Sequence, residues 1–224
     1  QRWPETKLQP STVRIDALME LLGSPQNGYP SIHIVGTNGK TSVARMVDAL
    51  LTAFGQRTGR TTSPHLQSAT ERIAIDNEPI SPGRYVETYR EIEPFVQMVD
   101  AQSLAGELGL AGPVMSKFEV VTGMAFAAFA DAPVDIAVVE AGMGGSWDAT
   151  NVVDATIAVI TPIGMDHAEY LGATVGEIAA EKAGVIRGPR GDPIPVETIA
   201  VIGRQPQAAM DVLLAHSVRV AAMV

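Results

Sequence analysis

Cysteine is missing from the 224-residue sequence. Its absence excludes a disulfide-stapled scaffold, a thiol nucleophile and a cysteine-ligated metal, and it agrees with a reducing compartment. Long apolar runs are missing too, because the longest, residues 120–130, falls well short of the ~20 residues of a membrane helix. The opening residues, QRWPETKLQP, lack the apolar core of a signal peptide. We therefore expect a cytoplasmic protein without a membrane partner.

Positive charge is scarce as well. The sequence has 16 Lys and Arg against 25 Asp and Glu, which gives a formal net charge of −9, and it contains no basic run. This balance excludes the electrostatic footprint of a protein that binds a nucleic-acid backbone. An anionic substrate would have to be held by a local site, because the overall field of the protein opposes its approach.

What the sequence does contain is a succession of short apolar strands and amphipathic helices. The pattern predicts the α/β class, with a mostly parallel sheet and helices on both faces. Alternation in ERIAIDNEPI, residues 71–80, indicates a peripheral hairpin with a turn at Asp76-Asn77, and residues 188–195 form a loop rich in Gly and Pro. We expect helices at 12–22, 42–54, 83–99, 116–129, 174–185 and 206–215, and strands at 32–35, 57–61, 134–139, 156–161 and 198–202.

Four consecutive strand ends carry glycine or ionisable residues. They read GTNGKTS, TSPHL, EAGMGGSWDATN and PIGMDHAEYLG. Ligands gather at the carboxyl ends of strands in open parallel sheets, so these segments are expected to meet at one edge. Their coincidence is a stronger indication of a site than any one of them.

The first of these segments has the character of a phosphate-binding loop. Its glycines and small residues let backbone N–H groups converge on an anion at a helix N-terminus, the lysine adds a positive charge, and a following hydroxyl can reach a metal. The spacing G-x-x-G-K-[ST] is shorter than the common form. The alternative is an ordinary turn with a surface lysine. The candidate nucleotide-binding residues are Gly36, Thr37, Asn38, Gly39, Lys40, Thr41 and Ser42.

Several other polar residues leave more than one interpretation open. Glu140 at a buried strand end suits Mg²⁺, or it is a solvated strand end. Ser63 could add a neutral oxygen or only form a turn, and His167 could be a ligand, a base or a hydrogen-bonded loop residue. Lys182, on a helix, reads by default as a solvated charge. His33, inside an apolar strand, reads as structural.

Taken in order, the segments GTNGKTS, TTSPHLQSATERI, MSKFE, EAGMGGSWDATNVVDA, ITPIGMDHAEYLG and EKAGVI resemble the N-terminal domain of the folylpolyglutamate synthase family, in particular its actinobacterial members. That family includes bifunctional dihydrofolate synthases and belongs to the Mur ligase superfamily. The resemblance implies a P-loop-containing domain like the central domain of Mur ligases over residues 1–224, with a C-terminal glutamate-ligase domain missing from this chain. It also implies a monomer.

The resemblance further implies roles for individual residues. Residues 37–40 would bind ATP phosphates, Ser63, Glu140 and His167 would ligate Mg²⁺, with two ions expected, and Lys182 would be carbamylated. The catalytic set would be Lys40, Glu140, His167 and Lys182. The folate or dihydropteroate pocket would be lined by Ser116, Lys117, Phe118, Glu119, Trp147, Asp148 and Ala149.

The implied reaction is ATP-dependent amide ligation: the γ-phosphoryl group of ATP activates a folate carboxylate, and L-glutamate attacks the acyl phosphate. Two positions depart from the usual pattern, since most relatives have arginine at Ser146 and valine at Ala141. Losing that guanidinium would remove a fork suited to carboxylate or phosphate. Two other readings stay open: a truncated domain that binds nucleotide or folate without activity, and a Mur-type ligase for peptidoglycan precursors.

Overall fold

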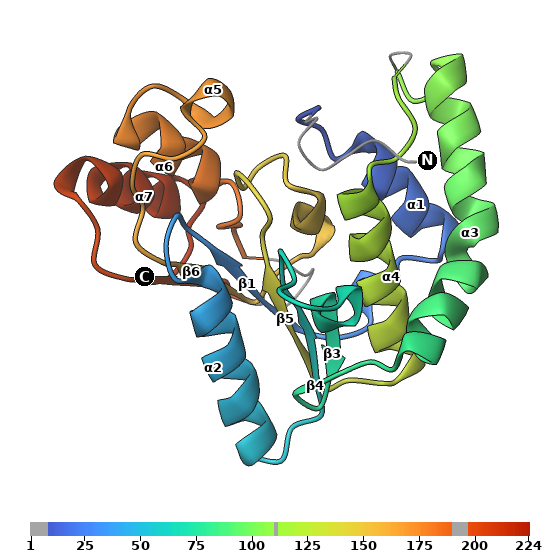
Figure 1. Cartoon of the computed structure of the whole chain (residues 1–224). Helices are drawn as coiled ribbons and strands as arrows, with labels where there is room; N and C mark the ends of the chain where they lie inside the picture. The colour runs from blue at the N-terminus through green and yellow to red at the C-terminus, as the bar shows by residue number, and fades with distance from the viewer. Residues whose placement is uncertain (1–8, 110–111, 190–196) are drawn as a thin grey trace.

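The residues that the structure describes form a seven-stranded sheet with helices on both faces (Figure 1). The computed structural model describes residues 9–109, 112–189 and 197–224. The strand order is β4-β3-β2-β5-β1-β6-β7, in which β2, β5, β1, β6 and β7 run parallel and β3 and β4 pair antiparallel at one edge. The strands are β1 (Ser31–Val35), β2 (Thr58–Thr61), β3 (Ile73–Ile75), β4 (Glu78–Pro79), β5 (Ile136–Glu140), β6 (Ile157–Ile160) and β7 (Ile199–Ile202).

Alternate residues of the central strands pack on opposite faces of the sheet. Ile34 and Val138 belong to a cluster with α2 on one face, whereas Val35 and Val139 belong to the clusters on the other face. On that other face, α1, α3 and α4 lie side by side at one end, and α6 and α7 at the other (Figure 1). The helices are α1 (Val13–Leu21), α2 (Lys40–Ala53), α3 (Pro82–Ala105), α4 (Lys117–Asp131), α5 (Ala168–Leu171), α6 (Val175–Ala183) and α7 (Gln207–Arg219).

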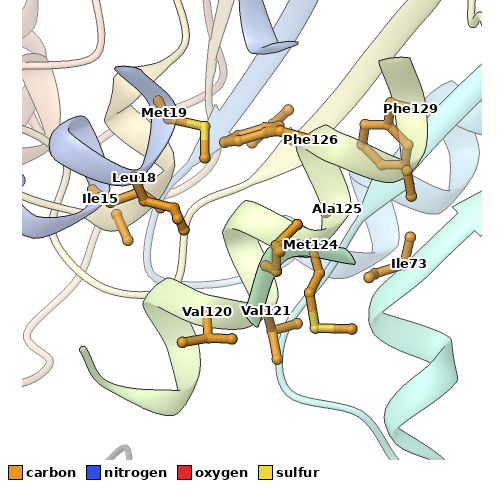
Figure 2. Packing of buried hydrophobic residues seen from close by; sticks show 14 of the residues in the cluster. Ile15, Leu18, Met19, Ile73, Val120, Val121, Met124, Ala125, Phe126 and Phe129 are labelled. Carbon is orange, nitrogen blue, oxygen red and sulfur yellow. The ribbon is translucent and has the colours of Figure 1, made fainter. Parts of the chain in front are cut away.

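The largest part of the core lies around α4, which is buried along most of its length. Figure 2 shows Phe126 and Met124 of this helix among side chains of α1 and the sheet. Glycine at position 123 makes the approach of α1 possible, since a Cβ there would lie 2.6 Å from Leu18 Cδ2. Helix α4 therefore fixes the position of α1 relative to the sheet.

The predicted fold class is confirmed, and the predicted elements are found with shifted ends. Helix α2 begins two residues early, at Lys40, because Gly39 takes a left-handed conformation (φ 83°) and starts the helix there. Helix α3 continues past the predicted end to Ala105, since its buried stripe extends to Ser103 before left-handed Gly106 ends it. The short α5 was not predicted. Residues 190–195 of the predicted Gly- and Pro-rich loop lie outside the described residues.

The predicted hairpin at residues 71–80 is confirmed as β3 and β4, with Asp76 and Asn77 both at positive φ in the turn. It is less peripheral than expected, because β3 pairs with β2 and extends the main sheet. Among the residues that the structure describes, no helix is both long and apolar enough to cross a bilayer.

Candidate functional site

A cavity of about 400 Å³ opens at the carboxyl ends of the parallel strands. Segments far apart in sequence contribute to it, as the strand-end argument predicts. Its lining combines Lys40, Ser63 and His167 with aromatic and acidic side chains. The lining residues are Gln9, Ser11, Arg14, Lys40, Ser63, Pro64, Ser116, Phe118, Glu119, Gly142, Met143, Trp147, Asp148, Ala149 and His167.

The loop between β1 and α2 is held against the end of β6. The backbone N–H groups of Thr37 and Asn38 both donate to Pro162 O, at 3.1 and 3.2 Å. Gly36 (φ 147°) lies so close to Thr161 that a Cβ would stand 1.9 Å from the threonine Oγ1. Only glycine fits at position 36 without moving Thr161. In this conformation of the loop, the N-terminus of α2 lies at the cavity.

The first turn of α2 consists of Lys40, Thr41 and Ser42. Lys40 Nζ donates to Gly36 O at 3.2 Å, so its ammonium group lies over the loop. The N-cap residue, Gly39, has no side chain that could cap this helix end. A helix N-terminus of this kind with a lysine above it is a site suited to phosphate groups.

Glu140 is buried at the end of β5, with 2% of its surface exposed, so the solvated interpretation is wrong. Its Oε1 accepts a hydrogen bond from Thr41 Oγ1 at 2.7 Å, and its Oε2 accepts one from the Ser63 N–H at 3.3 Å. Burial raises the pKa of this carboxyl group, while the two hydrogen bonds and the positive charge of Lys40 oppose the rise. A cation bound next to Glu140 would therefore stabilise the charged form of this carboxylate.

His167 lies at the start of α5 in a left-handed conformation (φ 47°), with its ring half exposed at the cavity. The ring nitrogen Nε2 is 3.5 Å from Asp166 Oδ2. Ser63 lines the same cavity. The structure thus places His167, Ser63 and Lys40 in the lining of one cavity. Glu140 is joined to this group by the hydrogen bond from the Ser63 N–H.

Oxygen ligands around Glu140 fit a hard divalent cation. The carboxylate of Glu140 and the hydroxyls of Thr41 and Ser63 are the kind of ligand that Mg²⁺ prefers, together with phosphate oxygens and water. Across residues 9–109, 112–189 and 197–224, no three His, Asp or Glu side chains form a metal-binding cluster by themselves. The protein would therefore supply only some of the ligands of such an ion, and the phosphate oxygens of a nucleotide and water would supply the others.

Lys182 is buried on α6 with 4% of its surface exposed, which rules out the interpretation as a solvated charge. Burial, followed by the nearby positive charge of Lys40, lowers its pKa to about 8, while Asp148, Asp166 and Glu181 act in the opposite direction. A lysine with a pKa near 8 is partly neutral at physiological pH and can act as a nucleophile.

Phe118 and Trp147 are the aromatic residues of the cavity lining. Each ring lies against a glycine: a Cβ on Gly142 would stand 2.6 Å from Phe118 Cζ, and one on Gly144 would stand 2.9 Å from Trp147 Cζ2. The rings of Phe118 and Trp147 can pack against a flat heterocycle or aryl group of a ligand. Ser116 and Ala149 complete this part of the lining.

Asp148 is fixed by hydrogen bonds on both carboxylate oxygens. Oδ1 accepts from the Thr150 N–H at 2.9 Å and from its hydroxyl, and Oδ2 accepts from the Met143 N–H at 2.8 Å. His33 Nε2 lies 2.7 Å from Thr150 Oγ1. Because the threonine proton goes to Asp148, His33 donates through Nε2, and its role is structural as predicted. Burial raises the pKa of Asp148.

The sequence analysis missed a buried ion pair at the cavity wall. Arg14 Nε donates to Glu119 Oε1 at 3.0 Å, and its Nη1 donates to Gln9 Oε1 at 2.8 Å. Glu119 Oε2 accepts from the Ser116 N–H in a capping box at the start of α4. One signal was available, because Arg14 stands next to Ile15 and four residues before Leu18 on the apolar stripe of α1.

Lys117 is not brought to this cavity. Its side chain is exposed and lines a separate groove with Tyr85 and Tyr89 of α3. The reason is helical geometry, since Lys117 has the i, i+3, i+4, i+7 spacing with Val120, Val121 and Met124, and this face of α4 lines the other groove. A contact from Lys117 to a ligand in the cavity is therefore not supported.

Comparison with known proteins gives strong matches. The chain is 68% identical over 225 aligned residues to a dihydrofolate synthase/folylpolyglutamate synthase of Mycobacterium tuberculosis, covering all of this chain and 45% of that protein. It is 36% identical to the protein of the same description from Bacillus subtilis, covering 90% of this chain and 44% of the relative. The chain thus spans less than half the length of these relatives. No protein-family model matches it.

Solved structures agree in fold. A Mycobacterium tuberculosis folylpolyglutamate synthase described as complexed with ADP and AMPPCP superimposes with a TM-score of 0.88 at 66% identity, over 96% of this chain and 46% of that one. A structure described as an FPGS-AMPPCP-folate complex gives a TM-score of 0.85 at 32% identity, over 97% of this chain and 50% of that one.

Proposed function

Because the chain belongs to the folylpolyglutamate synthase family, we propose that it is the ATP- and folate-binding part of an ATP-dependent ligase that adds L-glutamate to folates. Dihydropteroate is a second candidate substrate. The observation that carries the proposal is that Lys40 of the nucleotide loop and the aromatic rings of Phe118 and Trp147 line one and the same cavity. The proposal includes a cytoplasmic location, where the reaction would have its supply of ATP.

The proposed chemistry starts with attack of a folate carboxylate on the γ-phosphorus of ATP, which breaks the bond to the bridging oxygen, releases ADP and forms an acyl phosphate. A carboxylate is a weak nucleophile toward a polyanion, so negative charge at the phosphate must be offset and the attack held in line. The free N–H groups of α2 and Lys40 Nζ would hold the phosphates there. The amine of glutamate then attacks the acyl phosphate, forming the amide and releasing phosphate.

Magnesium has a place in this proposal because its ligands fit the site. Ser63, Glu140 and His167, with Thr41 beside them, would hold the ion, which supplies positive charge to the phosphate oxygens when bound. His167 is assigned to ligation, since attack by the substrate carboxylate, which already lacks its proton, needs no base. Lys182 would become negatively charged by carbamylation, and its partly neutral amine supports this assignment.

Binding to the 224-residue chain tests the phosphate-loop assignment. We expect Lys40→Ala to weaken AMPPCP binding by about tenfold or more, because it removes a positive charge from the phosphate site. Lys117→Ala is the matched control, since its side chain lies in the other groove. Equal effects of the two substitutions, measured by calorimetry with Mg²⁺, would contradict the assignment.

An assay of turnover separates ligation from binding alone. The relatives are about twice as long, so we expect the 224-residue chain to bind AMPPCP and folate but to release no ADP with folate and glutamate. Glutamate-dependent ADP release by this chain would show that it is sufficient for the reaction.

Competition binding separates folate from muramyl substrates. Tighter competition by a UDP-muramyl precursor than by folate would favour the interpretation as a Mur-type ligase instead.

A further inference from the structure

Glu181, near the end of α6, lies behind the cavity wall and is absent from the residues that line it. Its carboxylate accepts three hydrogen bonds from the loop that carries Trp147. Oε1 accepts from the N–H groups of Gly145 at 3.1 Å and Trp147 at 3.4 Å, and Oε2 accepts from Ser146 Oγ at 2.6 Å. One side chain therefore holds three consecutive residues.

The backbones of the loop and the helix are also in direct contact. The Ser146 N–H donates to Glu181 O at 3.1 Å. A Cβ on Gly145 would stand 2.6 Å from the same oxygen, and a Cβ on Gly184 would stand 2.5 Å from Ser146 Cβ. Gly145 in the loop and Gly184 at the end of α6 thus allow the two backbones to come close, which larger residues would prevent. This close contact restricts the position of the loop.

The consequence reaches the cavity through the end of this loop. Trp147 is the last of the three anchored residues and Asp148 follows it directly, and both line the cavity. We infer that Glu181 is a positioning residue for the ring-bearing substrate: it fixes the indole of Trp147 as a cavity wall without touching the substrate. This inference rests on the proposed function, because it assigns folate to that wall.

The inference also reinterprets Ser146. Its hydroxyl points to Glu181 rather than to the cavity, and the residue does not line the cavity. The side chain at this position therefore helps to hold the loop. The hydrogen bond to Glu181 explains the orientation of the Ser146 side chain without a direct contact to the substrate.

The test uses Trp147 as its own reporter. The sequence has two tryptophans, so Trp3→Phe leaves Trp147 as the only one. In that background we compare Glu181→Ala and Glu181→Gln with Glu177→Ala, which removes the capping box at the other end of the same helix. Circular dichroism and thermal unfolding confirm that each variant is folded.

We expect Glu181→Ala to increase acrylamide quenching of Trp147 and to weaken folate binding by about fivefold or more, the effect of losing hydrogen bonds to a charged acceptor. AMPPCP binding should change by less than about twofold, and Glu181→Gln, which keeps an acceptor, should retain most of the folate affinity. Glu177→Ala should leave the quenching unchanged.

Unchanged quenching and folate affinity in folded Glu181→Ala would overturn the inference. An equal loss of AMPPCP and folate binding would overturn it as well, because it would indicate general damage to the site. If the unmutated chain binds no folate, the proposed function fails, and the quenching comparison alone decides whether Glu181 positions Trp147.

Discussion

The hydroxyl of Thr41 donates a 2.7 Å hydrogen bond to Oε1 of Glu140, joining the first turn of α2 to the end of β5. These residues are 99 positions apart in sequence. Their contact places a buried carboxylate directly behind the phosphate loop. Burial raises the pKa of this carboxyl group because it disfavours the anionic form, and a divalent cation beside it would stabilise that form.

Glu140→Gln should therefore remove the Mg²⁺ dependence of nucleotide binding. We expect AMPPCP affinity in Mg²⁺ to fall by about tenfold or more, since the amide keeps the shape but loses the charge that binds the cation. Calorimetry with and without EDTA checks this. In EDTA the variant and the original chain should bind alike, and a Mg²⁺ dependence that survives in Glu140→Gln would count against the metal assignment.

Arg14→Ala should destabilise the chain strongly. It leaves Glu119 buried without its ion-pair partner, and breaking a buried pair in this way costs about 3–5 kcal/mol. Arg84→Ala is the matched control, because Arg84 pairs with Glu87 and Glu91 at the exposed surface, where pairs contribute about 0–1 kcal/mol. Urea unfolding of both variants gives the comparison, and similar losses would contradict a special role for the buried pair.

Lys182 should form a carbamate with dissolved CO₂. Burial lowers its pKa to about 8, so roughly a tenth of the amine is neutral at pH 7 and able to attack CO₂, far more than for an ordinary lysine. With ¹³C-labelled bicarbonate, carbon NMR should show a carbamate signal that Lys182→Met abolishes. The signal should weaken as pH falls below 8, because the amine becomes protonated. A signal that persists in Lys182→Met would place the modification elsewhere.

His33 should make the chain less stable in mild acid. Burial, followed by the charge of Arg187, lowers its pKa from 6.5 to about 3 in the folded chain, so the unfolded chain binds a proton first as pH falls. The contribution of His33 to stability is complete above pH 6.5 and is lost at up to ~1.4 kcal/mol per pH unit as pH falls toward 3.

The measurement is the difference in unfolding free energy between His33→Gln and the original chain over this range. Taking the difference cancels the titration of the other groups. The curve for the variant should be flatter below pH 6.5, whereas parallel curves would show that His33 does not carry the effect.

The sequence alone determined the order of strands and helices and the place of the phosphate loop. Both depend on local physics: apolar periodicity specifies each element, and glycines followed by a lysine between strand and helix specify an anion-binding turn. The carboxyl-edge rule also predicted that Lys40, Ser63 and His167 would meet. These parts required no knowledge of distant contacts.

Only the tertiary structure decided which charges are buried. Glu140 and Lys182 could be solvated or enclosed according to their local sequence, and packing of α2 and α6 against the sheet encloses both. Packing likewise paired Arg14 with Glu119, turned Lys117 away from the cavity and set Glu181 behind Trp147. Burial and pairing depend on residues distant in the chain, and such contacts leave no periodic trace in the sequence around either partner.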